Sequence, residues 1–296
     1  MKRGYTIGGF NVVITSDVIS AAGVSSSASF EMLMCEIVNY FYNNNEMDVV
    51  TRAKIGQYAE NIKWDKQSGL LDQMACGYGG LITIDFKDRE NPVIQPLQFD
   101  AINKDYDLLI VPTGANHADL SEEYSSIPTE MKAVAQQLGA KVLGELTIED
   151  VLAHVERLRA TAGDRAVLRA LHFFEENGRV DRQVQALSEG DAETFLKLVT
   201  ESGNSSWKWL QNCYSNTNPD EQGVTVHLAL SELFIRRNGA GACRVHGGGF
   251  AGVIMVMLPK TLTEAYEQYM KDFGVDKIYK VQIRKYGDVH VGSLPV

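Results

Sequence analysis

Apolar positions along the chain follow two different spacings. Continuous apolar runs at 81–86, 106–112 and 253–258 are short and flanked by turn residues, which predicts buried strands. The run at 11–19 is rich in valine and isoleucine and predicts a further strand. Two more strands are expected near the end of the chain, at 277–283 and 290–291.

Other segments repeat their apolar residues at helical spacing. Helices are predicted over 30–41, from residue 48 to about 62, over 224–238 and over 262–273. Almost all of 120–210 has the same pattern. The expected breaks in that region fall at glycines, namely Gly139, Gly144, Gly163, Gly178, Gly190 and Gly203. Strands mixed with helices, without a regular βαβ repeat, predict an α+β fold.

The stretch 88–105 interrupts both patterns. It is polar and contains two prolines, so it is a candidate linker or edge region. A chain of 296 residues is long enough for one large domain or two ordinary ones.

Composition and charge restrict the class of partner. The formal net charge is −10 with 45% hydrophobic residues, which predicts a globular protein and argues against nucleic acid or an anionic membrane as partner. The sequence has no apolar run of 18 residues and no signal-peptide pattern at its start, so a cytoplasmic location is expected. The four cysteines lack CxxC spacing, which argues against a zinc site and a disulfide framework.

A serine-rich loop precedes the first predicted helix. It consists of Gly23, Val24, Ser25, Ser26, Ser27 and Ala28. A glycine allows close approach of the backbone, serines add hydroxyl donors, and a helix N-terminus offers unpaired N–H groups to a phosphate. The alternative is an ordinary serine N-cap.

Two later stretches carry candidate chemistry. Residues 68–73 contain Gly69, which punctuates the chain, and Asp72, which begins another helical turn. Asp72 is either a helix N-cap or a carboxylate that faces a substrate, and Glu60, twelve residues earlier, is either a solvated helix-end carboxylate or a ligand. The run Gly247, Gly248 and Gly249 is either a tight turn or a point of close approach to a ligand.

In this order the three stretches resemble the GHMP kinase superfamily, and within it the galactokinases. That family has a G-L-S-S-S-A phosphate loop, a C-G-[IL]-[LM]-D-Q segment and a late S-R-M-T-G-G-G-F-G-G loop. The stretches 121–124 and 195–202 agree with further family segments, as does His117. The resemblance covers nearly the whole chain.

The resemblance implies a fold of two α+β domains. Residues 1–104 would form the N-terminal ATP-binding domain, related to domain 2 of ribosomal protein S5, and 105–296 a helix-rich, ferredoxin-like C-terminal domain. The implied reaction is ATP-dependent phosphorylation of the anomeric hydroxyl of galactose. Alternatives are another hexose or an N-acetylhexosamine, a different alcohol such as mevalonate, and a non-catalytic sugar or nucleotide sensor. A monomer or weak homodimer is expected.

The resemblance also implies roles for individual residues. Gly23 to Ala28 and Gly247 to Gly249 would bind the phosphates of ATP. Ser27 and Glu60 would hold Mg²⁺, which prefers hard oxygen ligands. Asp72 would be the catalytic carboxylate, and the sugar would contact Gly69, Asp72 and Tyr124.

The sequence departs from the family pattern at several positions. The family's first motif, G-E-H-x-D-Y, has no counterpart, so we expect a fragment that lacks the sugar-binding N-terminal motif and the start of the first domain, or a relative that has lost that site. His246 stands where the family has threonine, Ala251 where it has glycine, Asn116 where it has a basic residue and Ser126 where it has arginine. His246 is either a packed side chain or one that contacts phosphate or sugar.

Overall fold

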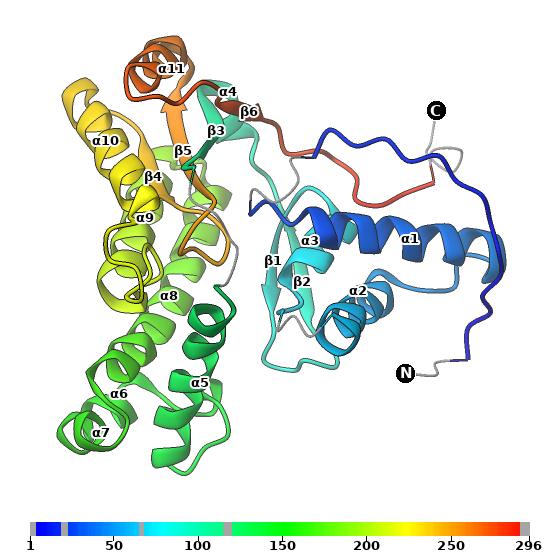
Figure 1. Ribbon diagram of the computed structural model, residues 1–296, viewed down its shortest axis with the longest axis horizontal. Coiled ribbons are helices and arrows are strands. Elements are labelled where there is room, and N and C mark those ends of the chain that lie inside the picture. The colour runs from blue at the N-terminus through cyan, green and yellow to red at the C-terminus, as the bar shows by residue number, and fades with distance from the viewer. Residues whose placement is uncertain (1–3, 19–22, 65–67, 115–119, 291–296) are drawn as a thin grey trace. The chain divides into compact units, whose positions relative to one another are not determined.

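The computed structural model describes residues 4–18, 23–64, 68–114 and 120–290. The chain divides into two compact units (Figure 1). Unit 1 contains residues 1–97 together with 282–296, and unit 2 contains residues 98–281. The predicted domain boundary between residues 104 and 105 remains a proposal. His117 and Asn116 lie outside the described residues.

Unit 1 combines helices with a small antiparallel sheet. Its elements are α1 (Ser26–Tyr42), α2 (Val49–Tyr58), which continues as a π-helical turn (Ala59–Lys63), α3 (Leu71–Tyr78), β1 (Leu81–Asp85) and β2 (Val93–Leu97). Strand β1 pairs with β2 in antiparallel register, with Leu81 opposite Leu97. The helices predicted from residues 30 and 48 are confirmed, and Asp48 caps α2 by accepting from the N–H of Thr51.

The core of unit 1 lies where α1, α2 and α3 meet. Met32, Ala53 and Met74 are fully buried, one from each helix. Apolar side chains from β1 and β2 pack against them, among them Ile84 and Ile94. The same-face spacing of these residues along their helices explains why the pattern predicts the elements correctly.

The predicted strand at 11–19 is wrong for its described part, 11–18. Among the described residues no strand pairs with this segment, and Val13 is 92% exposed. A strand needs a hydrogen-bonding neighbour, so β-branched residues alone do not produce one. Instead, the preceding segment bonds to the end of α1, where the Thr6 N–H donates to Asn43 Oδ1 at 2.9 Å.

Unit 2 is built from a sheet and a larger set of helices. Its helices are α4 (Asp100–Asp105), α5 (Ser121–Gln137), α6 (Ile148–Leu152), α7 (Val155–Thr161), α8 (Asp164–Glu189), α9 (Ala192–Ser205) with a π-helical turn (Ser206–Leu210), α10 (Gly223–Asn238) and α11 (Thr263–Lys271). Its strands are β3 (Tyr106–Pro112), β4 (Ala242–Val245), β5 (Val253–Pro259) and β6 (Tyr279–Val281). Short 3₁₀ turns occur at Leu143–Glu145 and Lys260–Leu262.

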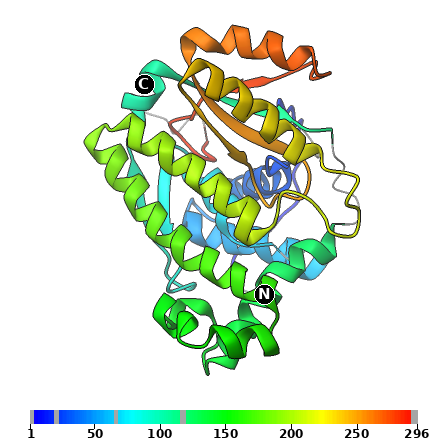
Figure 2. The same cartoon turned by 90° about the vertical axis from the view of Figure 1, so that its left-hand side faces the viewer.

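The sheet of unit 2 has the order β4-β5-β3-β6 with antiparallel neighbours. Along β3, Leu109 and Val111 face the core made with α10 and α11, while Leu108 faces α9 and α4. Figure 2 shows α10 and α11, in yellow and orange, lying along the strands. Both faces are covered, which explains why β3 and β5 are continuous apolar runs and are predicted almost to the residue.

Two of the predicted helix breaks are wrong. Gly178 lies within α8 and Gly203 within α9. A Cβ at residue 203 would lie 2.9 Å from the Arg244 Cβ, so this glycine allows α9 to pack closely on β4. The glycines at 163, 190 and 139 do end or begin helices, with positive φ.

The remaining differences concern short elements. The stretch 88–105 contains β2 and α4 as well as turns, and β4 lies in a region for which no strand was predicted. Strand β6 covers only part of 277–283. In the last predicted strand His290 has no regular structure, and Val291 lies outside the described residues. No helix in the described part of the chain is both long and apolar enough to span a membrane.

Candidate active site

The N-terminus of α1 presents the serine-rich loop. Gly23 and Ser25 both adopt left-handed backbone, with φ of 76° and 59°. Ser25 is the N-cap residue, but its side chain makes no capping hydrogen bond within the described residues. The first turn therefore offers N–H groups, the positive end of the helix dipole and serine hydroxyls in one place, which suits a phosphate group.

Ser27 is linked to Glu60. The Ser27 Oγ donates to Glu60 Oε1 at 2.7 Å. Glu60 lies in the π-helical turn that continues α2, and its side chain is 2% exposed. Such turns widen a helix locally and are frequent at functional sites. A hydroxyl and a carboxylate are thus held side by side at the start of α1.

The side-chain amide of Gln73 links the Glu60 carboxylate to that of Glu31. Gln73 Nε2 donates to Glu60 Oε2 and to Glu31 Oε2, at 3.1 Å each. Glu31 and Gln73 are both buried. Gly56 makes room for them, since a Cβ there would lie 2.9 Å from Glu31 Oε2. Buried carboxylates are costly unless they are hydrogen-bonded, so this arrangement fixes Glu60 in place.

Asp72 lies in the first turn of α3 and is exposed. Leu70 is the N-cap residue of this helix, so the interpretation of Asp72 as the N-cap is wrong. The positive end of the helix dipole favours a carboxylate at this position. Gly69 is exposed as well, and no described atom lies within 4 Å of the Cβ position at this residue, which leaves space for a ligand.

In unit 2 the glycine loop 247–249 is held by two side chains. The Tyr124 hydroxyl donates to the Gly249 carbonyl at 2.9 Å, and Asn212 Nδ2 donates to the Gly248 carbonyl at 3.1 Å. Gly247 and Gly249 have φ of 69° and 82°. Burial raises the pKa of Tyr124 to about 12, so its hydroxyl keeps its proton and remains a donor.

A buried ion pair holds the backbone next to Asn212, the residue that holds this loop. Asn212 follows Gln211, a non-glycine residue with φ of 57° after the π-helical turn Ser206–Leu210. Arg169, 1% exposed, donates from Nε to the Leu210 carbonyl at 3.0 Å and pairs with Glu130 at 2.9 Å. The strained backbone at the end of this turn is thereby anchored to α8 and α5.

Comparison with known proteins shows the family to which the chain belongs. The model of the GHMP kinases N terminal domain matches residues 1–80. The galactokinase of Thermotoga petrophila is 30% identical over 283 residues, which cover 93% of this chain and 74% of that protein. The galactokinase of Lactobacillus helveticus is 31% identical over 276 residues, which cover 92% of this chain and 66% of that one.

The chain belongs to the galactokinase family of the GHMP kinases. The fold agrees: the structure of Lactococcus lactis galactokinase complexed with galactose matches with a TM-score of 0.74 at 23% identity, covering 92% of this chain and 68% of that one. The predicted α+β GHMP kinase fold is therefore confirmed. The family consists of phosphotransferases that act on a sugar hydroxyl.

The galactokinase-type residues named from the sequence fall into two groups. Ser27 and Glu60 are in direct contact, and Gln73, the neighbour of Asp72, is bonded to Glu60. Tyr124 is in contact with the glycine loop. The backbone N–H of His246 donates to the Val253 carbonyl at 3.2 Å, at the start of that loop.

The sequence did not single out the supporting residues. Glu31 has a signal, because it lies four residues after Ser27 and hence on the same face of α1. Gln73 lies inside a recognised motif but has no assigned role there. Asn212 and Arg169 have no sequence signal, since their partners are backbone carbonyls from distant segments.

Gly249→Ala should destabilise the fold far more than Gly139→Ala. The two glycines share nearly the same φ, 82° and 80°, but a Cβ at 249 would lie 2.1 Å from the Asn212 carbonyl oxygen, whereas no described atom lies within 4 Å of one at 139. The backbone term costs about 1–2 kcal/mol in both, and the clash adds about 1–3 kcal/mol in the first. Urea unfolding measures the difference. Equal losses of unfolding free energy in the two variants would contradict the close contact between Gly249 and the Asn212 carbonyl.

Proposed function

We propose that the chain transfers the γ-phosphoryl group of ATP to the anomeric hydroxyl of galactose, giving galactose 1-phosphate and ADP. In this reaction the sugar oxygen forms a bond to the γ-phosphorus, and the bond from that phosphorus to the bridging oxygen of ADP breaks. The observation that carries the proposal is the contact of Ser27 with Glu60 at the start of α1. The printed names of the relatives support the choice of sugar.

Phosphoryl transfer depends on positioning and charge stabilisation more than on covalent steps. The start of α1, from Gly23 to Ala28, is proposed to bind the phosphates of ATP through backbone N–H groups and serine hydroxyls. Asp72 is proposed to accept the proton of the sugar hydroxyl. Alternatively, the negatively charged Asp72 carboxylate would orient that hydroxyl without taking its proton. The exposed position of Asp72 next to Gly69 leaves room for a sugar.

The donor set at Ser27 and Glu60 fits Mg²⁺. Both donors are oxygens, and the described residues contain no cluster of three or more His, Cys, Asp or Glu side chains that would hold a metal by themselves. Mg²⁺ commonly binds one or two protein oxygens and completes its shell with water and phosphate. Ser27 and Glu60 would hold the ion, which would offset the negative charge of the phosphates when bound.

In unit 2 we propose that Gly247, Gly248 and Gly249 contact the phosphates and that Tyr124 contacts the sugar. The absence of side chains on this loop permits close approach of a ligand to the backbone. Tyr124 also holds the carbonyl of Gly249, so its removal would affect the loop as well as the sugar.

A panel of acceptor alcohols tests the proposal. ADP release from ATP with Mg²⁺ is measured with galactose, glucose, N-acetylgalactosamine, mannose and mevalonate as acceptors, each against a reaction without acceptor. Galactose should give the highest kcat/KM. A higher value for another acceptor would replace galactose as the substrate. Nucleotide binding without turnover on any acceptor would favour a non-catalytic sensor.

A further inference from the structure

The segment after β6 is attached to unit 1. Residues 282–290, called the C-terminal strap here, hydrogen-bond to the end of α3: the Gly80 N–H donates to the Arg284 carbonyl at 2.7 Å, and the Asp288 N–H donates to the Cys76 carbonyl at 3.0 Å. The backbones touch, since a Cβ at Gly287 would lie 1.9 Å from the Gly77 carbonyl oxygen. The strap is therefore packed against α3 without intervening side chains.

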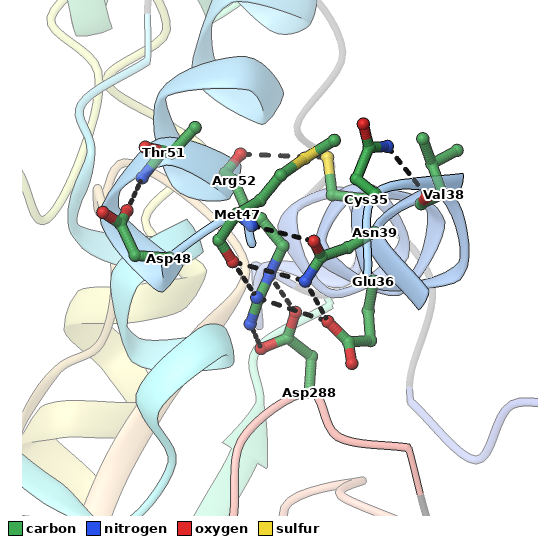
Figure 3. Close-up of polar contacts among 10 residues, drawn as sticks. Cys35, Glu36, Val38, Asn39, Met47, Asp48, Thr51, Arg52 and Asp288 are labelled. Carbon is green, nitrogen blue, oxygen red and sulfur yellow. Dashed lines mark hydrogen bonds and ion pairs between the residues drawn. The ribbon is translucent and has the colours of Figure 1, made fainter. Parts of the chain in front are cut away.

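The Asp288 side chain enters an ion-pair cluster with Arg52 (Figure 3). Arg52 donates from Nε to Asp288 Oδ2 and from Nη2 to Asp288 Oδ1, at 3.2 Å each. Its Nη1 donates to the Met47 carbonyl at 2.7 Å and lies 3.3 Å from Glu36 Oε2. The side chains of Arg52 and Asp288 are only 8% and 7% exposed. One guanidinium thus connects α1, α2 and the strap.

This cluster and the proposed active site lie on the same three helices, at different positions along each helix. On α1, Glu36 follows Ser27 by nine residues, or about 13 Å of helix. On α2, Arg52 precedes Glu60 by eight residues, or about 12 Å. On α3, the carbonyl of Cys76 that binds the strap lies one turn after Asp72. The helices pack against one another throughout.

Ionisation of the buried Asp288 carboxyl does not itself add stability at neutral pH. Burial raises the pKa of the Asp288 carboxyl from its ordinary 3.8 to about 6, although Arg52 lowers it. Because the folded pKa lies above the unfolded one, the carboxyl stabilises the fold most below pH 4, and this contribution is lost as the pH rises through about 6. In some proteins a buried ion pair fixes one packing arrangement instead of adding stability.

We propose that Asp288 and Arg52 are positioning residues, whose ion pair with Glu36 sets the packing of α1, α2 and α3 and thereby the placement of Ser27, Glu60 and Asp72. The inference rests on the proposed function for its kinetic consequence and on the packing of unit 1 for its structural one. Protonation of Asp288 lowers the cost of burying this carboxyl but removes the charge that holds Arg52 in the bidentate contact, so the relative placement of the three helices is less strictly set.

Other titratable groups face the cluster and enter the test. The charged and titratable neighbours are Glu36, Glu31 and Cys35 on α1, Asp48 before α2 and Arg52 on it, Cys76 and Tyr78 on α3, and Arg284 on the strap. His290 lies two residues after Asp288. Burial raises the pKa of Cys35 to about 11 and that of Cys76 above its ordinary value, so both thiols stay neutral between pH 5 and 8. His290, stacked on Tyr40, needs its own control.

Asp288→Asn tests the proposal with matched controls. The Asn side chain keeps the shape but loses the charge. The first control is Glu90→Gln. Glu90 is exposed and pairs with Lys54, which lies on α2 as Arg52 does, so this variant removes a charge from an ion pair outside the cluster. The second is His290→Gln. In each protein, kcat/KM for MgATP is measured from pH 5 to 8.5 with galactose, and hydrogen exchange of peptides covering 26–36 and 71–78 is measured at pH 7.5 without ligands.

The wild type should show an acid limb with a midpoint near pH 6 that Asp288→Asn lacks. At pH 7.5 the variant should have roughly tenfold lower kcat/KM and faster exchange in both peptides, while at pH 5 the two proteins should converge. Glu90→Gln and His290→Gln should both keep the acid limb of the wild-type pH profile. Equal pH profiles and equal exchange in wild type and Asp288→Asn would overturn the inference.

The two readouts separate this inference from the proposed function. If no acceptor is phosphorylated, the exchange measurement still decides whether Asp288 sets the packing of α1 and α3. If Asp288→Asn does not fold, the wild type supplies the same comparison. Its hydrogen exchange in these two peptides, corrected for the intrinsic rate, should be faster at pH 5 than at pH 7.5. Unchanged protection across that pH range would overturn the inference in that case.

Discussion

Asp72→Asn should lower kcat for ADP formation from MgATP and galactose by about 10³-fold, with little change in KM for MgATP. The carboxylate is exposed at the start of α3, and Leu70 rather than Asp72 is the N-cap, so its replacement leaves the helix intact. An amide of the same shape neither accepts the proton of the sugar hydroxyl nor supplies a negative charge beside it. A coupled ADP assay measures the loss.

The matched control for this variant is Asp100→Asn. Asp100 lies in the first turn of α4, as Asp72 does in α3, and is also exposed. It should keep wild-type kcat. Retention of more than about a tenth of the activity by Asp72→Asn would contradict the role of Asp72, since general bases typically contribute 10²–10⁴-fold.

Ser27→Ala and Glu60→Gln should each lower kcat/KM for MgATP by about 10²-fold and raise the Mg²⁺ concentration required for half-maximal rate. The two side chains lie 2.7 Å apart and are proposed to hold the same ion. The double variant should therefore lose less than the product of the single losses, because groups that share one partner are not additive.

Ser29→Ala serves as the control, since Ser29 is two residues further along α1 and has no assigned role in the site. It should leave the Mg²⁺ dependence unchanged. Glu60→Gln keeps an acceptor for Ser27 and Gln73, so its unfolding in urea should remain close to that of the wild type. Fully multiplicative losses in the double variant would show that Ser27 and Glu60 act on separate groups.

The fold is predictable where burial alone decides the structure. Strands β3 and β5 have apolar residues on both faces, and both faces are covered by helices, so their sequence runs match their bounds. The long helices are predictable for the same reason, as their buried residues recur on one face.

The neighbour with which a strand pairs cannot be predicted from the strand's own apolar pattern. The segment 11–18 has the composition of a strand but no strand beside it among the described residues, and β2 contains Pro96, which argues against a strand until β1 is seen to pair with it. Strand β4 is short and flanked by glycines that hide its apolar character.

The candidate site shows a similar division. Ser27 contacts Glu60 within unit 1, and Tyr124 contacts the glycine loop within unit 2, but the side chains that hold these groups are found only in the structure. Glu31 and Gln73 fix Glu60, and Asn212 fixes the glycine loop, each through contacts between segments far apart in sequence. The Arg52–Asp288 pair joins positions 236 residues apart, which no local pattern reveals.

The position of the transferred phosphate tests the central proposal most directly. Galactose is incubated with ATP, Mg²⁺ and the protein, and the product is examined by ³¹P NMR with proton coupling. A phosphorus signal coupled to the anomeric proton of galactose, absent when Asp72→Asn replaces the wild type, is the predicted result. A phosphate on any other hydroxyl, or ADP formation in which the sugar remains unmodified, would contradict the proposal that this chain is an anomeric galactose kinase.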